Sequence, residues 1–282
     1  MKLTKSLSVS LYAAIALGLS LLAIVLRTLN FFFFFDTELN YDAQGAILPL
    51  ITNWLLILSV LFFGIASIVM FRKKIELPER VPSVAGRVGA ALVALALLYC
   101  AVVDLFEGAP LYALFCIGGA LYFVLLAFGQ GAPLLRILSS LCATIRLLLM
   151  MTSVYFDWLI PLNAPDKLIF ELACTFGMLF LVCDLRAIVD KPKSLLYGFS
   201  LATATLLCGT ASIPSLITVF SMAPTSGIPT AHRLVLAALF VYAVLSLFDM
   251  VRSLLPAVQK TAEQSVPVEE TTLHEENVDA DQ

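Results

Sequence analysis

Charged residues are scarce in this sequence, and their scarcity excludes a water-soluble globular protein. Only 13% of the 282 residues are charged, against 61% that are hydrophobic, whereas a typical soluble domain has about 25% charged and about 45–50% apolar residues. The apolar residues form long blocks, and a block of about 18 or more can cross a bilayer as a helix. The composition therefore predicts an integral membrane protein, with the lipid bilayer as its surroundings.

Catalytic motifs are also missing. The sequence has only two histidines, His232 and His274, and contains no H-E-x-x-H motif, no G-x-S-x-G motif and no phosphate-binding glycine loop. It has no basic cluster with interleaved aromatic residues, which disfavours a nucleic-acid partner. We therefore expect neither an enzyme nor a bound cofactor. An intramembrane enzyme using paired acids, such as Asp104 with Glu107 at a predicted turn, is the least favoured interpretation.

The cysteines do not form a recognisable framework. All lie inside apolar blocks and none belongs to a C-x-x-C pair: Cys100, Cys116, Cys142, Cys174, Cys183 and Cys208. A buried free cysteine behaves as a small apolar residue. We therefore expect neither structural disulfides nor a metal site from these residues.

The apolar blocks predict an all-α, polytopic bundle of about eight transmembrane helices. The blocks lie near residues 7–29, 46–71, 84–106, 110–129, 134–158, 167–189, 194–221 and 232–255. Each block is long enough to cross about 30 Å of hydrocarbon at about 1.5 Å per residue. The membrane bundle is therefore expected to occupy residues 1–258.

Residues 259–282 are predicted to form a disordered, acidic tail. From residue 260 onward the tail has seven acids and a single base, Lys260, and it lacks apolar periodicity. Such a tail either remains solvated or contacts a protein partner.

The basic residues predict the orientation, because short cytoplasmic loops are rich in Lys and Arg. Thirteen of the 17 bases lie at the chain ends or in the loops on the same side, and the opposite side has only Arg27, Lys167 and Arg233. Both termini are therefore expected to be cytoplasmic. The first apolar block is too long for a cleaved signal sequence. With short loops and no organellar targeting segment, a bacterial plasma membrane is the expected location.

Arg146 is the strongest candidate for a functional residue, because it lies near the middle of the fifth block. An arginine at bilayer depth costs at least about 2.5–3.5 kcal/mol, so it should face the bundle interior or a wet cavity. Ser139 lies seven residues before Arg146 and Ser153 seven residues after it. Asp157 follows Ser153 by four residues, on the same helix stripe. No other predicted block places an acid at matching depth, which predicts that Arg146 lacks a carboxylate partner.

The seventh block could supply the opposite wall of a site. Pro214 lies inside it and removes the hydrogen bond to the carbonyl of Thr210. Broken, hydroxyl-rich helices line substrate sites in many transporters. The predicted ligand or ion path therefore comprises Arg146, Ser139, Ser153, Asp157, Thr210 and Pro214. The alternative is a structural arginine that bonds to helix carbonyls or extends toward Glu171.

Two functional hypotheses follow. The first is a carrier or permease component for a small solute, with an anion favoured by Arg146. The second is a non-transporting membrane protein, such as a sensor, a scaffold or an accessory subunit. Water access at Arg146 should distinguish the two hypotheses.

Overall fold

The computed structural model describes residues 2–36, 41–43, 45–72, 83–129, 131–189, 194–221 and 227–264. Within these residues, eight helices are long and apolar enough to cross a membrane. This confirms the predicted all-α, multi-pass architecture. The helices are α1 Lys2–Phe33, α2 Ile47–Arg72, α3 Val84–Phe106, α4 Pro110–Phe128, α5 Pro133–Tyr155, α6 Pro165–Val189, α7 Ser194–Phe220 and α8 Thr230–Gln264. A short antiparallel hairpin, β1 Phe35–Asp36 with β2 Tyr41–Asp42, follows α1.

Local sequence signals explain several helix ends. Ser83 caps α3 by accepting a hydrogen bond from the Gly86 amide at 3.2 Å. Pro110 and Pro133 begin α4 and α5, where a proline costs no backbone hydrogen bond. Gly129 ends α4 in the left-handed conformation, at φ 67°, which favours glycine.

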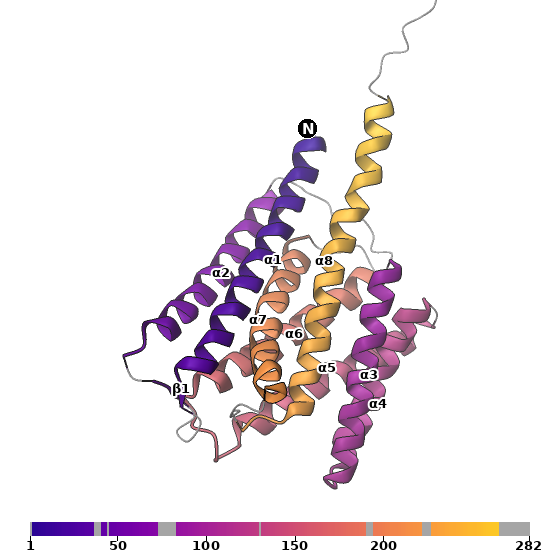
Figure 1. Ribbon diagram of the computed structural model, residues 1–282. Helices are drawn as coiled ribbons and strands as arrows, with labels where there is room; N and C mark the ends of the chain where they lie inside the picture. Colours follow the sequence, from indigo (N-terminus) through magenta and orange to yellow (C-terminus); the bar gives the residue numbers. More distant parts are fainter. Residues whose placement is uncertain are drawn as a thin grey trace, which may run out of the picture.

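The helices alternate in direction, so the bundle has two distinct ends. Figure 1 shows the start of α1 and the end of α8 on the same side, which we call the terminal side. The strand β1 and the turn between α3 and α4 lie on the other side, which we call the hairpin side. The cytoplasmic location of the terminal side remains a prediction from the basic residues.

Five helices surround a central axis. Side chains of α3, α4, α5, α6 and α8 line one cavity of about 10 Å³: Val93, Leu97, Phe123, Ala143, Leu147, Leu181, Val235 and Leu239. We call these five helices the ring. Helix α7 packs between α6 and α8 of the ring and also contacts α1 and α2. Its apolar segment is 78% buried, the largest share among the eight helices.

Glycines bring the ring helices close together. A Cβ atom added to Gly119 of α4 would lie 2.9 Å from the Cα of Ala143 on α5. At Gly89 of α3, an added Cβ would lie 3.2 Å from the Cα of Tyr242 on α8. Small residues at such crossings allow the tight packing on which membrane helices depend.

Candidate functional site

Arg146 forms an ion pair in the interior of the bundle. Its side chain is fully buried, and its Nη2 atom lies 3.1 Å from Oδ1 and 3.0 Å from Oδ2 of Asp104. Asp104, on α3, is itself only 3% exposed. The expectation that Arg146 lacks a carboxylate partner is therefore wrong.

The length of the arginine side chain explains this difference. Asp104 lies in the last turn of α3, which ends at Phe106, whereas Arg146 lies nine residues before the end of α5 at Tyr155. Long cationic side chains extend along their helices toward polar surroundings. The prediction considered only the depth of the Arg146 backbone. It therefore missed Asp104, which lies nearer the hairpin side.

Three further side chains contact the guanidinium. Its Nη2 atom lies 3.0 Å from Sγ of Cys100 and 3.3 Å from Nε2 of His232. The ring of Tyr112 faces the guanidinium carbon at 5.5 Å from the ring centroid, within range of a cation–π contact. These residues come from α3, α4 and α8, so Arg146 connects four helices of the ring.

A second thiol completes the cluster. The Cys116 thiol, on α4, donates to Oδ2 of Asp104 at 3.4 Å and also contacts the thiol of Cys100. We call Arg146, Asp104, Cys100, Cys116 and His232 the Arg146 cluster. Cys100 and Asp104 lie four residues apart on one face of α3. An acid inside an apolar block, one turn from a cysteine, is a signal from which sequence analysis could have found this pair.

The electrostatics of the cluster oppose binding of an anion by Arg146 alone. The carboxylate of Asp104 offsets the charge of the guanidinium, and both partners are buried. The Nε and Nη1 atoms of Arg146 are buried without a hydrogen-bond partner, as is Nδ1 of His232. Unsatisfied buried donors are costly. The cluster thus retains hydrogen-bonding capacity although the carboxylate of Asp104 offsets the charge of the guanidinium.

The other predicted residues of α5 do not join this cluster. The Ser139 hydroxyl donates to the carbonyl of Leu135 at 2.7 Å, and the Ser153 hydroxyl donates to that of Met150 at 2.9 Å. Asp157 follows the end of α5 and accepts from the Leu159 amide at 2.9 Å. Sharing a stripe with Arg146 therefore does not bring these groups into contact with it.

The predicted wall on α7 also lies apart from Arg146. The Thr210 hydroxyl donates to the carbonyl of Leu206, and Pro214 is buried within a continuous α7. The described hydrogen bonds and ion pairs of Arg146 run to α3 and α8 and do not reach α7. The hydroxyls of α7 bond mostly within their own helix, as Thr203, Thr205 and Ser212 also do.

A second polar cluster lies nearer the terminal side of the ring. Asp184 on α6 is fully buried and accepts hydrogen bonds from Tyr242 at 2.6 Å and Tyr122 at 3.4 Å. We call these three residues the Asp184 cluster. Tyr242 follows His232 by ten residues on α8, which corresponds to about 15 Å of helix rise.

Apolar side chains separate the two clusters. Val235 and Leu239 lie between His232 and Tyr242 on α8, and both line the small central cavity with Leu147 and Leu181. A cavity of about 10 Å³ has room for about one water molecule. The ring is therefore closed to a solute at this level in the conformation described.

A network of buried and partly buried charges joins helices on the hairpin side. Arg233 of α8 lies 3.0 Å from Asp166 of α6, and Arg27 of α1 lies 3.9 Å from Asp166 and 3.6 Å from Asp42 of the hairpin. Asn30 also donates to Asp42 at 2.7 Å. The amine of Lys167 instead bonds to three backbone carbonyls, those of Tyr155, Asp157 and Ile160. We call Arg27, Asp42, Asp166 and Arg233 the hairpin-side network.

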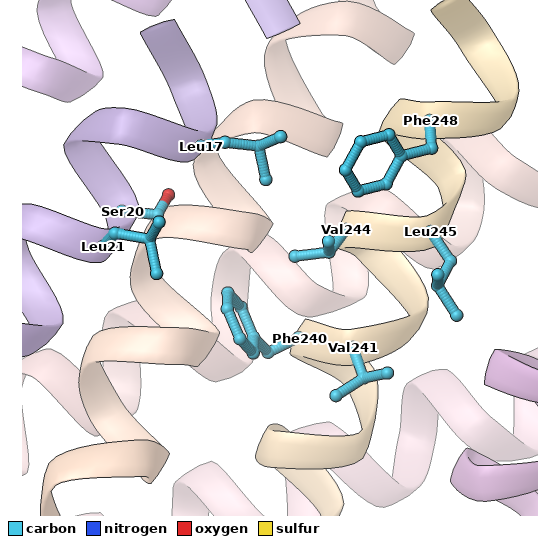
Figure 2. A pocket seen from close by; sticks show the side chains of 8 residues that line it. All are labelled: Leu17, Ser20, Leu21, Phe240, Val241, Val244, Leu245 and Phe248. Carbon is cyan, nitrogen blue, oxygen red and sulfur yellow. The ribbon is translucent and has the colours of Figure 1, made fainter. Parts of the chain in front are cut away.

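An apolar groove of about 280 Å³ lies between α1 and α8. Figure 2 shows Leu17, Ser20 and Leu21 on α1, with five apolar side chains of α8 across from them. The only hydroxyl in the lining, that of Ser20, donates to the carbonyl of Ala16 within α1. This groove therefore suits hydrocarbon and offers no site to a polar solute.

The fold and its buried charges define a multi-pass α-helical membrane protein. Comparison with known proteins gives no match: no family model, no curated protein and no solved structure is significantly similar to this chain. The assignment of function therefore depends on the buried clusters.

Proposed function

We propose that this protein is a carrier that moves a small solute through the interior of the ring formed by α3, α4, α5, α6 and α8. The observation that carries the proposal is the buried ion pair of Arg146 and Asp104, with His232 beside it. Ionisable residues inside membrane spans are costly and commonly mark substrate pathways or proton relays. The proposal assigns these groups to binding and coupling, and it includes no catalysed reaction.

The arrangement of polar levels supports a carrier. The Arg146 cluster and the Asp184 cluster face the same ring axis at different depths, and the apolar layer lies between them. A carrier must keep its path closed to one side while it opens to the other. Rearrangement of the apolar layer would open the Arg146 cluster to the terminal side, and the layer would have to close again before the cluster opens to the hairpin side.

The balanced charges of Arg146 and Asp104 favour a carrier that exchanges its solute for protons over one that attracts an anion with Arg146 alone. Asp104 offsets the charge of Arg146, so an anionic solute would have to displace that carboxylate. Carboxylates and imidazoles buried inside membrane spans commonly form proton relays. Coupling of solute movement to a proton gradient across the plasma membrane is therefore part of the proposal.

Uptake into proteoliposomes tests this function. The purified protein would be reconstituted with an imposed pH gradient and offered radiolabelled amino acids, small carboxylates and divalent cations. The proposal predicts gradient-dependent uptake of at least one class, lost in Asp104→Asn. Asp157→Asn is the matched control, because Asp157 lies outside the helices and the cluster. Absence of uptake across all three classes would contradict a carrier for such solutes.

A second candidate is a non-transporting membrane protein with a helical partner. The groove between α1 and α8 supports it, because apolar side chains line it at membrane depth. The groove would hold a transmembrane helix of the partner. Leu21→Arg should then reduce co-purification of the partner from membranes, and the wild-type protein should show no uptake in the proteoliposome assay.

A further inference from the structure

Three potential metal ligands converge in the Arg146 cluster. Sγ of Cys100, a carboxylate oxygen of Asp104 and one ring nitrogen of His232 all lie within 4.8 Å of one another, and all three residues are buried. Two of them come from one face of α3 and the third from α8. The fold has thus assembled these groups from parts of the chain far apart in sequence.

Cys116 supplies a fourth potential ligand. Its thiol lies 3.4 Å from Oδ2 of Asp104 and contacts the thiol of Cys100. Two thiols, an imidazole and a carboxylate form a donor set typical of zinc, which prefers about four ligands in a tetrahedral arrangement. Thiolate donors also discriminate against hard cations such as magnesium and calcium.

We propose that Cys100, Cys116, Asp104 and His232 form a binding site for a thiophilic divalent cation, with zinc as the natural occupant. Zinc as the transported solute rests on the proposed carrier function. Binding of zinc to the four residues does not depend on transport. It also reverses the sequence-based expectation that these cysteines hold no metal.

The guanidinium of Arg146 occupies the centre of this site in the conformation described. Its Nη2 atom lies 3.0 Å from Cys100 Sγ, 3.0 Å from Asp104 Oδ2 and 3.3 Å from His232 Nε2. A single positively charged nitrogen thus holds three of the four proposed ligands around a common point. Zinc would need distances of about 2.0–2.3 Å, so these three ligands would have to move inward by about 1 Å after the arginine withdraws.

Withdrawal of the arginine breaks the contacts of one atom, Nη2, and metal binding has to offset the lost ion pair with Asp104. Of the three guanidinium nitrogens of Arg146, only Nη2 forms the described hydrogen bonds, since Nε and Nη1 are buried without partners. The ring of Tyr112 faces the guanidinium at 5.5 Å and gives it a cation–π surface beside the site. Arg146 is therefore suited to hold the site together when no metal is bound.

Charge balance favours exchange of one cation for two protons. Without metal, the cluster holds one positive guanidinium and one negative carboxylate. When zinc binds, the S–H bonds of Cys100 and Cys116 break, both protons leave to water, and two zinc–thiolate bonds form with no change of oxidation state. The two thiolate charges offset the two charges of the ion. The buried cluster stays neutral in both states, as a low-dielectric interior requires.

Cobalt titration of the full-length protein in detergent tests the site, because Co²⁺ bound to thiolates absorbs through sulfur-to-metal charge transfer. We expect binding of about one ion per chain with release of about two protons. Cys100→Ser and Cys116→Ser should each weaken the charge-transfer band, and the double variant should abolish it. Cys208→Ser is the matched control, since Cys208 is buried on α7 and its thiol faces the carbonyl of Ala173.

Alkylation of the wild-type protein provides a measurement that needs no variant. Bound zinc should protect Cys100 and Cys116 from a small alkylating reagent and leave Cys142 unprotected, as mass spectrometry of the peptides would show. Absence of a charge-transfer band in the wild type, or a band that survives in the double variant, would overturn the metal site.

Transport is tested apart from binding. Zinc-dependent proton release from proteoliposomes would support both proposals, whereas cobalt binding in detergent without any zinc flux would leave the site intact and refute a zinc carrier. Uptake of another solute by a protein that binds neither cobalt nor zinc would refute the metal site and leave a carrier function standing.

Discussion

Asp104 on α3 and Arg146 on α5 pair at 3.0 Å in the interior of the ring, and both side chains are at most 5% exposed. Because each charge is buried against the other, removing one of them leaves the other without its partner. Breaking a buried pair in this way costs about 3–5 kcal/mol, whereas replacing both partners with apolar residues can be nearly neutral. The pair should therefore be strongly coupled in its effect on stability.

A double-mutant cycle measures this coupling. Arg146→Leu and Asp104→Leu should each lower the free energy of unfolding by about 3–5 kcal/mol, and the double variant should lose much less than the sum. Unfolding in mixed micelles provides the measurement. Glu107→Leu, at the exposed end of α3, is the control and should change stability little. Strict additivity of the two single variants would show that the charges do not interact.

The hairpin-side network should respond unequally to loss of its two acids. Asp166 is the described acid partner of both Arg27 and Arg233, whereas Asp42 partners Arg27 and Asn30. Asp166→Asn removes the described ion pair of Arg233 and one of the two ion pairs of Arg27, so it should cost about 3–5 kcal/mol. Asp42→Asn leaves Arg27 the carboxylate of Asp166 and should cost less. Equal losses in thermal unfolding would contradict this order.

The all-α architecture and its eight spans could be predicted from the sequence, because a bilayer requires long apolar helices whatever their packing. The position of Arg146 in the interior followed from the cost of exposing its charge to lipid. Its partners could not be predicted in the same way. Asp104, Cys100 and His232 meet it through the packing of α3, α5 and α8, and spacing along one helix says nothing about neighbouring helices.

The hydroxyls of α7 show the same limit. Their number indicated a polar path, yet Thr203, Thr205 and Thr210 each donate to a carbonyl one turn earlier in α7. A hydroxyl in a membrane helix can be satisfied by its own backbone. Hydroxyl content alone therefore does not locate a site.

Two glycines of similar appearance in the sequence should behave oppositely. A Cβ at Gly119 would lie 2.9 Å from the Ala143 backbone, whereas a Cβ at Gly18 would meet no atom within 4 Å. Gly119→Ala should therefore destabilise the bundle by about 1–3 kcal/mol, and Gly18→Ala should be neutral or gain up to about 1 kcal/mol from helix propensity. Thermal unfolding of the two variants side by side decides this, and equal effects would contradict the close crossing of α4 and α5.

The orientation predicted from the basic residues can be measured with reporters. Eight spans in the described part of the chain predict that both chain ends lie on one side of the membrane, and the excess of Lys and Arg predicts that this side is cytoplasmic. A reporter active only in the cytoplasm should be active after residue 282 and inactive when inserted near Asn40. Activity at both positions would contradict the eight-span topology, and the reverse pattern would invert the orientation.

Thiol accessibility in membranes tests the proposed path most directly. Cys100 in the Arg146 cluster and Cys208 on α7 are both fully buried in the conformation described, so their exposure differs only if the ring opens. A carrier must open the Arg146 cluster to water during its cycle, which would expose Cys100 and leave Cys208 packed. In single-cysteine variants, we predict that a water-soluble thiosulfonate reagent modifies Cys100 much faster than Cys208. Modification of Cys100 as slow as that of Cys208 would contradict a solute path through the ring.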